Sequence, residues 1–104
     1  MNPSKVNRQH LQALTDLPNI GPAMARDLQL LGIENPGQLT GKDPLAMFQR
    51  LCSITAHHQD PCVLDVFISV TRFMDGEEAQ PWWNYSTERK RLYGPDPSPA
   101  SPLA

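Results

Sequence analysis

The stretch Leu17-Pro18-Asn19-Ile20-Gly21-Pro22 decides the fold of this chain, because it is too rich in turn-forming residues to continue a helix. Asn19 is a non-glycine residue that tolerates left-handed backbone. Gly21 lets a ligand come close to the main chain. Pro22 has the φ of a first helical position, where its missing N–H costs nothing. We therefore predict a tight turn that leads directly into a helix.

Helical segments are expected on both sides of this turn. One-sided apolar spacing predicts a first helix over residues 4–15. The residues that define this spacing are Val6, His10, Leu11, Leu14 and Leu17. The second helix runs from Pro22 through Leu31, and Gly32 ends it as a left-handed cap.

The remainder of the chain also predicts helices. The pairs Asp43-Pro44 and Asp60-Pro61 each combine a capping residue with a proline, a helix-start signal. Residues 62–74 are apolar on most sides, so we expect this helix to be central. Residues 33–40 form a connector with at most one helical turn, and residues 86–93 a short last helix. The third helix is expected to direct toward the core Leu45, Met47, Phe48, Leu51, Cys52 and Ile54.

Length and composition indicate one all-α domain over residues 1–93 and a disordered tail over residues 94–104. The chain has 104 residues and 11 prolines, and four of these prolines fall in the last ten residues. A tail of Pro, Ser, Ala and Asp buries too little apolar surface to offset the entropy of ordering it.

The charge balance excludes a protein that is held to DNA or membrane by a general electrostatic field. The formal net charge is −2, so any contact with a polyanion must be local. The sequence contains neither an apolar run of 18 residues nor the pattern of a signal peptide. We therefore expect a cytoplasmic protein without membrane contact, and a monomer.

The turn and several later segments carry a family resemblance. Residues 17–28, followed by Leu31-Gly32-Ile33 and Gln38-Leu39, resemble the helix-hairpin-helix element of DNA repair polymerases and ligases. They are closer still to the C-terminal domain of TfoX-type competence regulators. With residues 60–67 and Pro81-Trp82-Trp83 included, the chain resembles the bacterial pathogenicity-locus family, often labelled mitomycin-resistance proteins.

This resemblance implies a small SAM-like helical bundle with the helix-hairpin-helix motif over residues 4–32. It also implies contact with DNA phosphates that does not depend on base sequence. The residues that would bind the phosphate are Asn19, Gly21, Ala23 and Met24. Arg26 and Lys42 would bind it as charge partners. The backbone carbonyls that would hold a monovalent cation, K⁺ or Na⁺, are those of Thr15, Leu17 and Ile20. The usual turn of these helix-hairpin-helix elements is Gly-x-Gly. Here Asn19 replaces the first glycine, and its side chain leaves less room for a phosphate to approach the main chain.

Structural interpretations stand beside the functional ones. The turn could simply join two packed helices. Trp82 and Trp83 are adjacent in a segment without helical pattern. In the structural interpretation, one ring caps the central helix and the other lies at the surface. In the functional interpretation, the pair stacks on a base or anchors a partner protein. The basic cluster consists of Arg89, Lys90 and Arg91, together with Lys5 and Arg8. It is either a solvated face or, if the segment of residues 89–91 folds back near the turn, the source of positive charge that the turn lacks.

Two further classes of site have little support. Cys52, His57, His58 and Cys62 are residue types that bind zinc. Their spacing matches no common zinc-finger pattern, and both thiols lie on apolar helix faces. No nucleophile–base set and no Walker loop is present, and we expect no enzyme. Asp60 and Asp65 have structural roles instead, as a helix cap and as the polar face of a buried helix.

Two functions follow from this sequence. The first is a DNA-binding accessory module that contacts phosphates through the turn. The alternative is a protein-interaction adaptor of the same fold, with the two tryptophans and the basic residues 89–91 as its contact surface.

Overall fold

A computed structural model describes residues 1–95 and 97 of the chain. It is built from helices and turns, and no strand occurs in that part of the chain. The four α-helices are α1 (Pro22–Leu30), α2 (Pro44–Thr55), α3 (Pro61–Met74) and α4 (Ser86–Tyr93). The 3₁₀ turns are η1 (Pro3–Lys5), η2 (Arg8–His10), η3 (Leu14–Asp16), η4 (Pro36–Leu39) and η5 (Trp82–Tyr85). The all-α prediction is confirmed, whereas most of the predicted tail lies outside the described residues.

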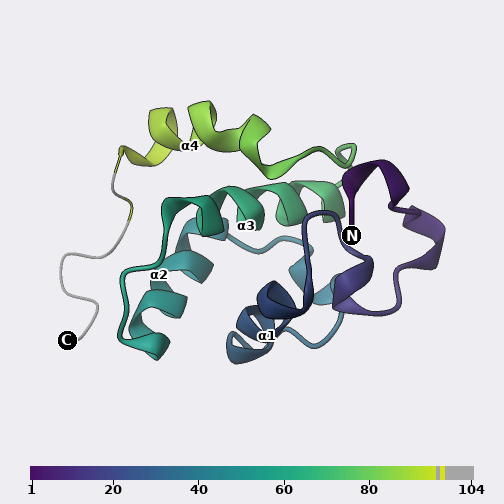
Figure 1. Cartoon of the computed structure of the whole chain (residues 1–104), viewed down its shortest axis with the longest axis horizontal. Coiled ribbons are helices and arrows are strands. Elements are labelled where there is room, and N and C mark those ends of the chain that lie inside the picture. Colours follow the sequence, from purple (N-terminus) through teal and green to yellow (C-terminus); the bar gives the residue numbers. More distant parts are fainter. Residues whose placement is uncertain (96, 98–104) are drawn as a thin grey trace.

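The helix α3 is central, as its apolar composition predicts. It packs against α2, α4, η4 and η5. Figure 1 shows α3 through the middle of the molecule, with α4 on one side of it and α1 on the other. Nine of its residues, from Leu64 to Phe73, are buried. No helix of the described chain is long and apolar enough to cross a membrane.

The starts of α2 and α3 are those that the Asp-Pro pairs predict. The Asp43 carboxylate accepts a hydrogen bond from the Leu45 N–H at 3.0 Å. The Asp60 carboxylate accepts one from the Cys62 N–H at 2.8 Å. Each cap satisfies one of the amides that a helix start leaves unpaired, and the proline after it removes another.

The predicted first helix over residues 4–15 is wrong. Three separate 3₁₀ turns, η1 to η3, replace it. The side chains of Asn2 and Asn7 each accept a hydrogen bond from the backbone N–H two residues further on. The Asp16 carboxylate accepts two more, from the N–H groups of residues 12 and 13. These short polar side chains offer the backbone partners that compete with a continuous helix.

The apolar residues of this segment still reach the core. Leu14 and Leu17 are buried, and Val6 and Leu11 pack against the core while partly exposed. By contrast, Ile54 was expected in the core and has 44% of its surface exposed. It lies in the last turn of α2, two residues before Ala56 ends the helix in left-handed backbone.

Candidate nucleic-acid interface

The turn before α1 is held in place by the side chain of Asn19. The backbone of Asn19 is left-handed, with φ of 67°, as the sequence predicts. Its side-chain amide donates to the Ser69 hydroxyl at 3.0 Å and to the Gln80 carbonyl at 2.8 Å. Asn19 therefore ties the turn to α3 and to the segment that precedes η5. Both hydrogen bonds that its side-chain amide donates are made within the molecule.

The start of α1 differs from the starts of α2 and α3. Gly21 is its N-cap, with φ −100° and ψ −174°, and provides no side-chain acceptor. The first amide of the helix to find a backbone acceptor is that of Ala25, which donates to the Gly21 carbonyl at 2.9 Å. The N–H groups of Gly21, Ala23 and Met24 have no acceptor among the described residues.

Glycine is not required at position 21 by the backbone. The φ and ψ angles are those of extended chain, which every residue adopts. A Cβ built on Gly21 would meet no atom within 4 Å. A capping side chain would therefore fit, and its absence leaves a row of free amides at the positive end of the helix dipole.

Two cationic residues were expected to accompany these amides. Arg26, one turn into α1, is exposed and forms no ion pair with another described residue. Lys42 lines a pocket of about 180 Å³ together with Leu31 and Ile33, which follow the C-terminal end of α1. Because nine helical residues span about 13 Å, Lys42 is placed toward the opposite end of α1 from Gly21.

Of the three carbonyls predicted to hold a cation, those of Leu17 and Ile20 already accept hydrogen bonds, whereas the Thr15 carbonyl accepts none from another described residue. The Ile20 carbonyl accepts a hydrogen bond from the Met1 amino group at 2.7 Å. Burial lowers the pKa of this amino group, against the opposing effect of Asp16. The Leu17 carbonyl accepts from the Ile20 N–H at 3.4 Å. A cation at this turn would therefore compete with the Met1 amino group.

The two tryptophans diverge in their environments. Trp82 packs against the core, and Trp83 has 61% of its surface exposed. Their rings are nearly perpendicular, at 82°, with centroids 5.6 Å apart. One ring thus packs inward and the other lies at the surface, as the structural interpretation predicts, and the exposed ring of Trp83 is the one open to a base or a partner.

Of the predicted basic cluster in α4, Arg89 is buried, whereas Lys90 and Arg91 are exposed. Arg89 is 6% exposed, and its guanidinium donates to the Asp65 carboxylate, with Nε 2.9 Å from Oδ1. The Ser86 hydroxyl donates to the same carboxylate at 2.6 Å. Asp65 has the structural role expected of it, and its carboxylate is fully buried and paired. Lys90 and Arg91 remain exposed.

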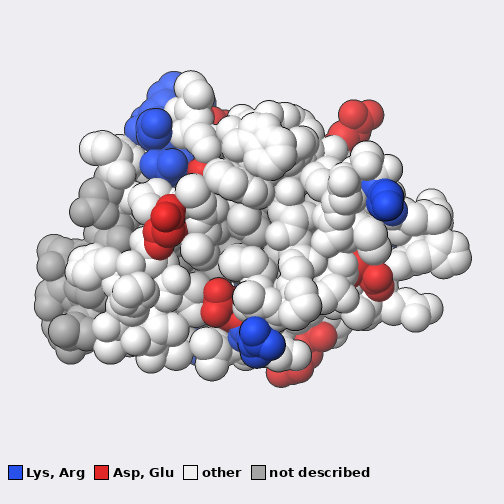
Figure 2. Space-filling view, viewed as in Figure 1, with Lys and Arg blue, Asp and Glu red and all other residues white. Residues whose placement is uncertain are grey.

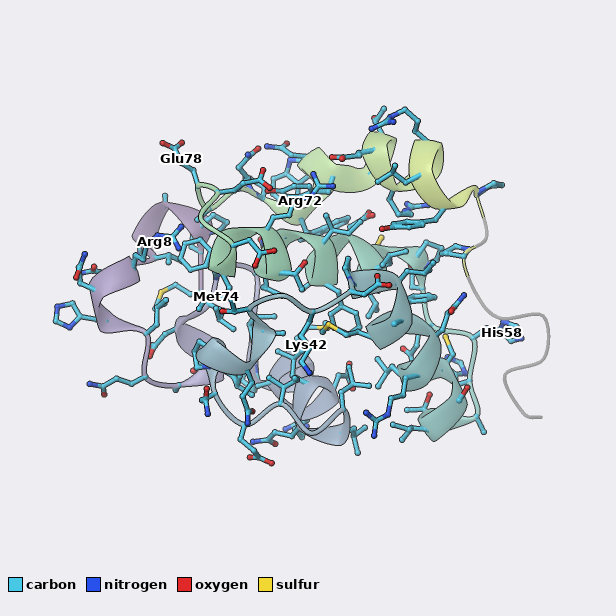
Figure 3. All side chains as sticks on the ribbon, turned by 180° about the vertical axis from the view of Figure 1, so that it is seen from behind. Arg8, Lys42, His58, Arg72, Met74 and Glu78 are labelled. Carbon is cyan, nitrogen blue, oxygen red and sulfur yellow. The ribbon has the colours of Figure 1, made fainter. Side chains whose placement is uncertain are left out.

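A second ion pair joins α3 to α4. The Arg72 guanidinium donates to both carboxylate oxygens of Glu88, each at 2.6 Å. Figure 3 shows Arg72 between these two helices. The hydrogen bonds from Arg72 hold the pKa of Glu88 below its usual value. Figure 1 shows α4 on the side of α3 away from α1, so the exposed cations of α4 are not at the start of α1.

The cysteines have structural environments. Cys52 is fully buried in α2, and Cys62 is partly buried at the start of α3. A hydrogen bond to Asp60 raises the pKa of the Cys62 thiol. Within residues 1–95 and 97, no three His, Cys, Asp or Glu side chains lie close enough together to hold a metal ion.

Comparison with known proteins identifies the family. A family model described as Pathogenicity locus (Cdd1) matches residues 7–91. The chain is also similar to the mitomycin resistance protein McrB of Streptomyces lavendulae, with 39% identity over 79 residues. The match covers 76% of this chain and 75% of that relative. No solved structure matches the chain. This chain therefore belongs to the pathogenicity-locus family.

Proposed function

We propose that this protein is a small DNA-binding accessory module. The turn before α1 holds phosphates of the DNA backbone and does not read base sequence. One observation carries this proposal: the free amides of Gly21, Ala23 and Met24 stand at a helix start whose geometry would accept a capping side chain.

The chemistry of these amides suits a phosphate. A helix start combines unpaired N–H donors with a partial positive charge, so an anion binds there without a side-chain cation. Compared with glycine, a Ser, Asp or Asn cap would stabilise the helix by roughly a few tenths of a kcal/mol and would occupy the same donors. Glycine leaves them available to a ligand, and the exposed Arg26 adds a positive charge one turn away.

The remaining predicted contacts have different places in this proposal. Asn19 fixes the shape of the turn through Ser69 and Gln80, so its role is to position the neighbouring amides. Lys42, toward the other end of α1, would meet a different phosphate from the one at Gly21. A monovalent cation at the turn would need to displace the Met1 amino group from the Ile20 carbonyl.

The expected binding is weak and depends on salt. A turn of this size meets about two to four phosphates, and each contributes about −0.9 to the slope of log K against log salt. The net charge of −2 provides no general attraction that would raise the affinity.

A series of Gly21 variants tests the proposal. Gly21→Asp caps the helix and places a carboxylate where the phosphate would bind. Gly21→Asn provides a cap of the same shape without the charge, and Gly21→Ala leaves the amides free. We expect Gly21→Ala to bind a labelled duplex within about twofold of the native affinity at low salt, Gly21→Asn to bind more weakly, and Gly21→Asp to lose at least about tenfold.

The stability of the same variants provides the control. Both capping variants should unfold at higher denaturant. Gly21→Asn should gain roughly a few tenths of a kcal/mol, and Gly21→Asp, whose carboxylate also interacts favourably with the helix dipole, about 0.5–1 kcal/mol. Loss of binding in a more stable protein cannot result from unfolding. The proposal is abandoned if the native chain binds no nucleic acid at low ionic strength, or if Gly21→Asp binds DNA as Gly21→Ala does.

The adaptor function is a second candidate, and the exposure of Trp83 favours it. A large exposed aromatic side chain is typical of a protein contact. Capture from native cell extract distinguishes the two functions: a stoichiometric protein partner that persists after nuclease treatment supports the adaptor.

A further inference from the structure

We propose that Trp83, Lys90 and Arg91 form a second binding surface, for an unpaired stretch of DNA. A base stacks on the Trp83 ring, and the two cations contact the phosphates that follow. This inference rests on the proposed function only in that the ligand is again DNA, since the surface belongs to η5 and α4 and not to the turn.

The three residues share one exposed face. The 3₁₀ turn η5 leads without interruption into α4, and the backbone of Ser86 is helical, with φ −62° and ψ −42°. In such a segment, positions three and four residues apart lie on the same side. Trp83, Lys90 and Arg91 are all exposed, whereas Tyr85 and Arg89 between them are buried. The indole and the cations are therefore about two helical turns apart, roughly 10 Å.

The acidic groups near this face have cationic partners within the molecule, and the half-exposed Glu77 shares Arg72 with Glu88 at 3.7 Å. Asp65 is paired with Arg89, and Glu88 with Arg72. Arg91 lies 3.8 Å from Glu88, but its side chain is 69% exposed, and such a surface contact is weak. Lys90 and Arg91 therefore give this face a positive charge in a chain whose net charge is −2. Figure 2 shows Lys and Arg side chains gathered over the C-terminal end of α4.

The Trp83 ring is also held in a fixed position. It meets the ring of Trp82 edge to face, and Trp82 packs against the core. η5 packs against α3, and Ser86 at the start of α4 is bonded to Asp65 of α3. A ring that is ordered before binding loses little entropy when a base stacks on it.

The polarity around Trp83 favours a nucleic acid over a protein. The exposed residues that neighbour it, Asn84 and Thr87, are polar, and the next exposed positions along the face are Lys90 and Arg91. The centre of a protein interface is depleted of charge and is formed by packed apolar groups. An aromatic ring beside cations is the arrangement with which proteins bind single strands, where bases are free to stack. In a duplex the bases are already stacked, so only an unpaired base can use this ring.

Short oligothymidine, about ten nucleotides long, is the probe because it forms no internal pairs and covers a typical single-strand site. Its binding to the full chain is followed at low salt by the anisotropy of a label on the DNA and by tryptophan fluorescence. We expect Trp83→Ala and the double variant Lys90→Gln/Arg91→Gln each to weaken binding about tenfold. Trp83→Phe keeps an aromatic face and should restore most of the affinity. Lys5→Gln, which removes an exposed charge elsewhere, should bind within about twofold.

The Gly21→Asp variant separates this inference from the proposed function. If both are right, Gly21→Asp loses duplex binding and keeps oligothymidine binding, and Trp83→Ala does the reverse. If Gly21→Asp loses both ligands and Trp83→Ala loses neither, the second surface is refuted and the turn accounts for all binding. If oligothymidine binds to Trp83 while the duplex does not bind, the second surface stands alone. Absence of oligothymidine binding refutes it, and a protein captured through Trp83 in that case identifies an adaptor surface.

Discussion

At the scale of single residues, Asn19 and Gly21 stand in the same turn and meet different requirements. Asn19 adopts left-handed backbone, which only glycine, asparagine and aspartate visit routinely. Gly21 is extended and open, so sterics do not select glycine there. The residue that the backbone constrains is thus Asn19, and the unconstrained Gly21 is the one whose lack of a side chain leaves donors free.

Substitution of Asn19 separates its backbone role from its side-chain role. Asn19→Gly keeps the left-handed backbone but loses the bonds to Ser69 and Gln80, which should cost about 1–2 kcal/mol of unfolding free energy. Asn19→Ala adds the strain of a left-handed alanine and should cost about 1 kcal/mol more. Urea unfolding measures both values. If Asn19→Gly is as stable as the native chain, the side chain does not tie the turn to α3.

Ala56 offers a stabilising change at the residue scale. It ends α2 in left-handed backbone, with φ of 52°, and is exposed. Glycine has no Cβ penalty in this conformation and is the common residue at such helix ends. Ala56→Gly should therefore raise the unfolding free energy by about 0.5–1 kcal/mol. A lower melting temperature for this variant would contradict the backbone assignment.

At the scale of elements, the helix starts with strong local signals could be predicted from the sequence. The Asp-Pro pairs place the starts of α2 and α3, and Pro22 places the start of α1. The segment before the turn could not be predicted correctly from the spacing of apolar residues over 4–15. That spacing does not reveal the hydrogen bonds that the side chains of Asn2, Asn7 and Asp16 accept from nearby backbone amides. Those local bonds select three short turns over one helix.

The buried pair between α3 and α4 was missed for a different reason. Asp65 and Arg89 are 24 residues apart, and only the packing of α4 on α3 brings them together. One signal was present in the sequence: Asp65 is the single acidic residue of the mostly apolar helix α3, and a buried carboxylate requires a partner. Which of the arginines serves Asp65 depends on the tertiary structure.

This pair yields a prediction about how α4 is fixed. Arg89→Met leaves the carboxylate of Asp65 buried without its cation and should cost about 3–5 kcal/mol. The double variant Asp65→Leu/Arg89→Met removes both charges and should recover most of that loss. Denaturant unfolding of the single and double variants tests this. If Arg89→Met loses less than about 1 kcal/mol, α4 does not depend on the pair.

At the scale of the whole molecule, three carboxylates predict how stability responds to acid. Backbone hydrogen bonds lower the pKa of Asp16 and Asp60, and the bonds from Arg72 lower that of Glu88. A carboxyl group with a lowered pKa in the folded state contributes stability above its unfolded pKa, and this is lost as the pH falls through the folded pKa. Stability should therefore decline from about pH 4 downward.

The acid response has a matched control. Glu88→Gln removes one of the three groups, so its unfolding free energy should change less between about pH 5 and pH 2 than that of the native chain. Chemical unfolding at several pH values measures this slope. A native chain whose stability rises as the pH falls through this window would contradict the lowered pKa values.

The distribution of charge over the molecule limits which of its groups could attract DNA in the proposed function. The net charge is −2, and several arginines already bind groups of the protein itself: Arg72 and Arg89 in ion pairs, and Arg8 at the carbonyls of Phe73 and Glu77. Under the proposed function, attraction to DNA would therefore come from local groups, chiefly the free amides at the start of α1. The contact should weaken steeply with added salt.

Amide NMR of the full chain with a short DNA duplex tests the central claim most directly. The duplex is added at low salt, and the salt concentration is then raised to the physiological value. Our account predicts that the amide signals of Gly21, Ala23 and Met24 shift on addition of DNA and return as salt is added. If these signals stay unchanged at low salt, with DNA either unbound or bound at another surface, the turn before α1 is a structural connection and not a phosphate site.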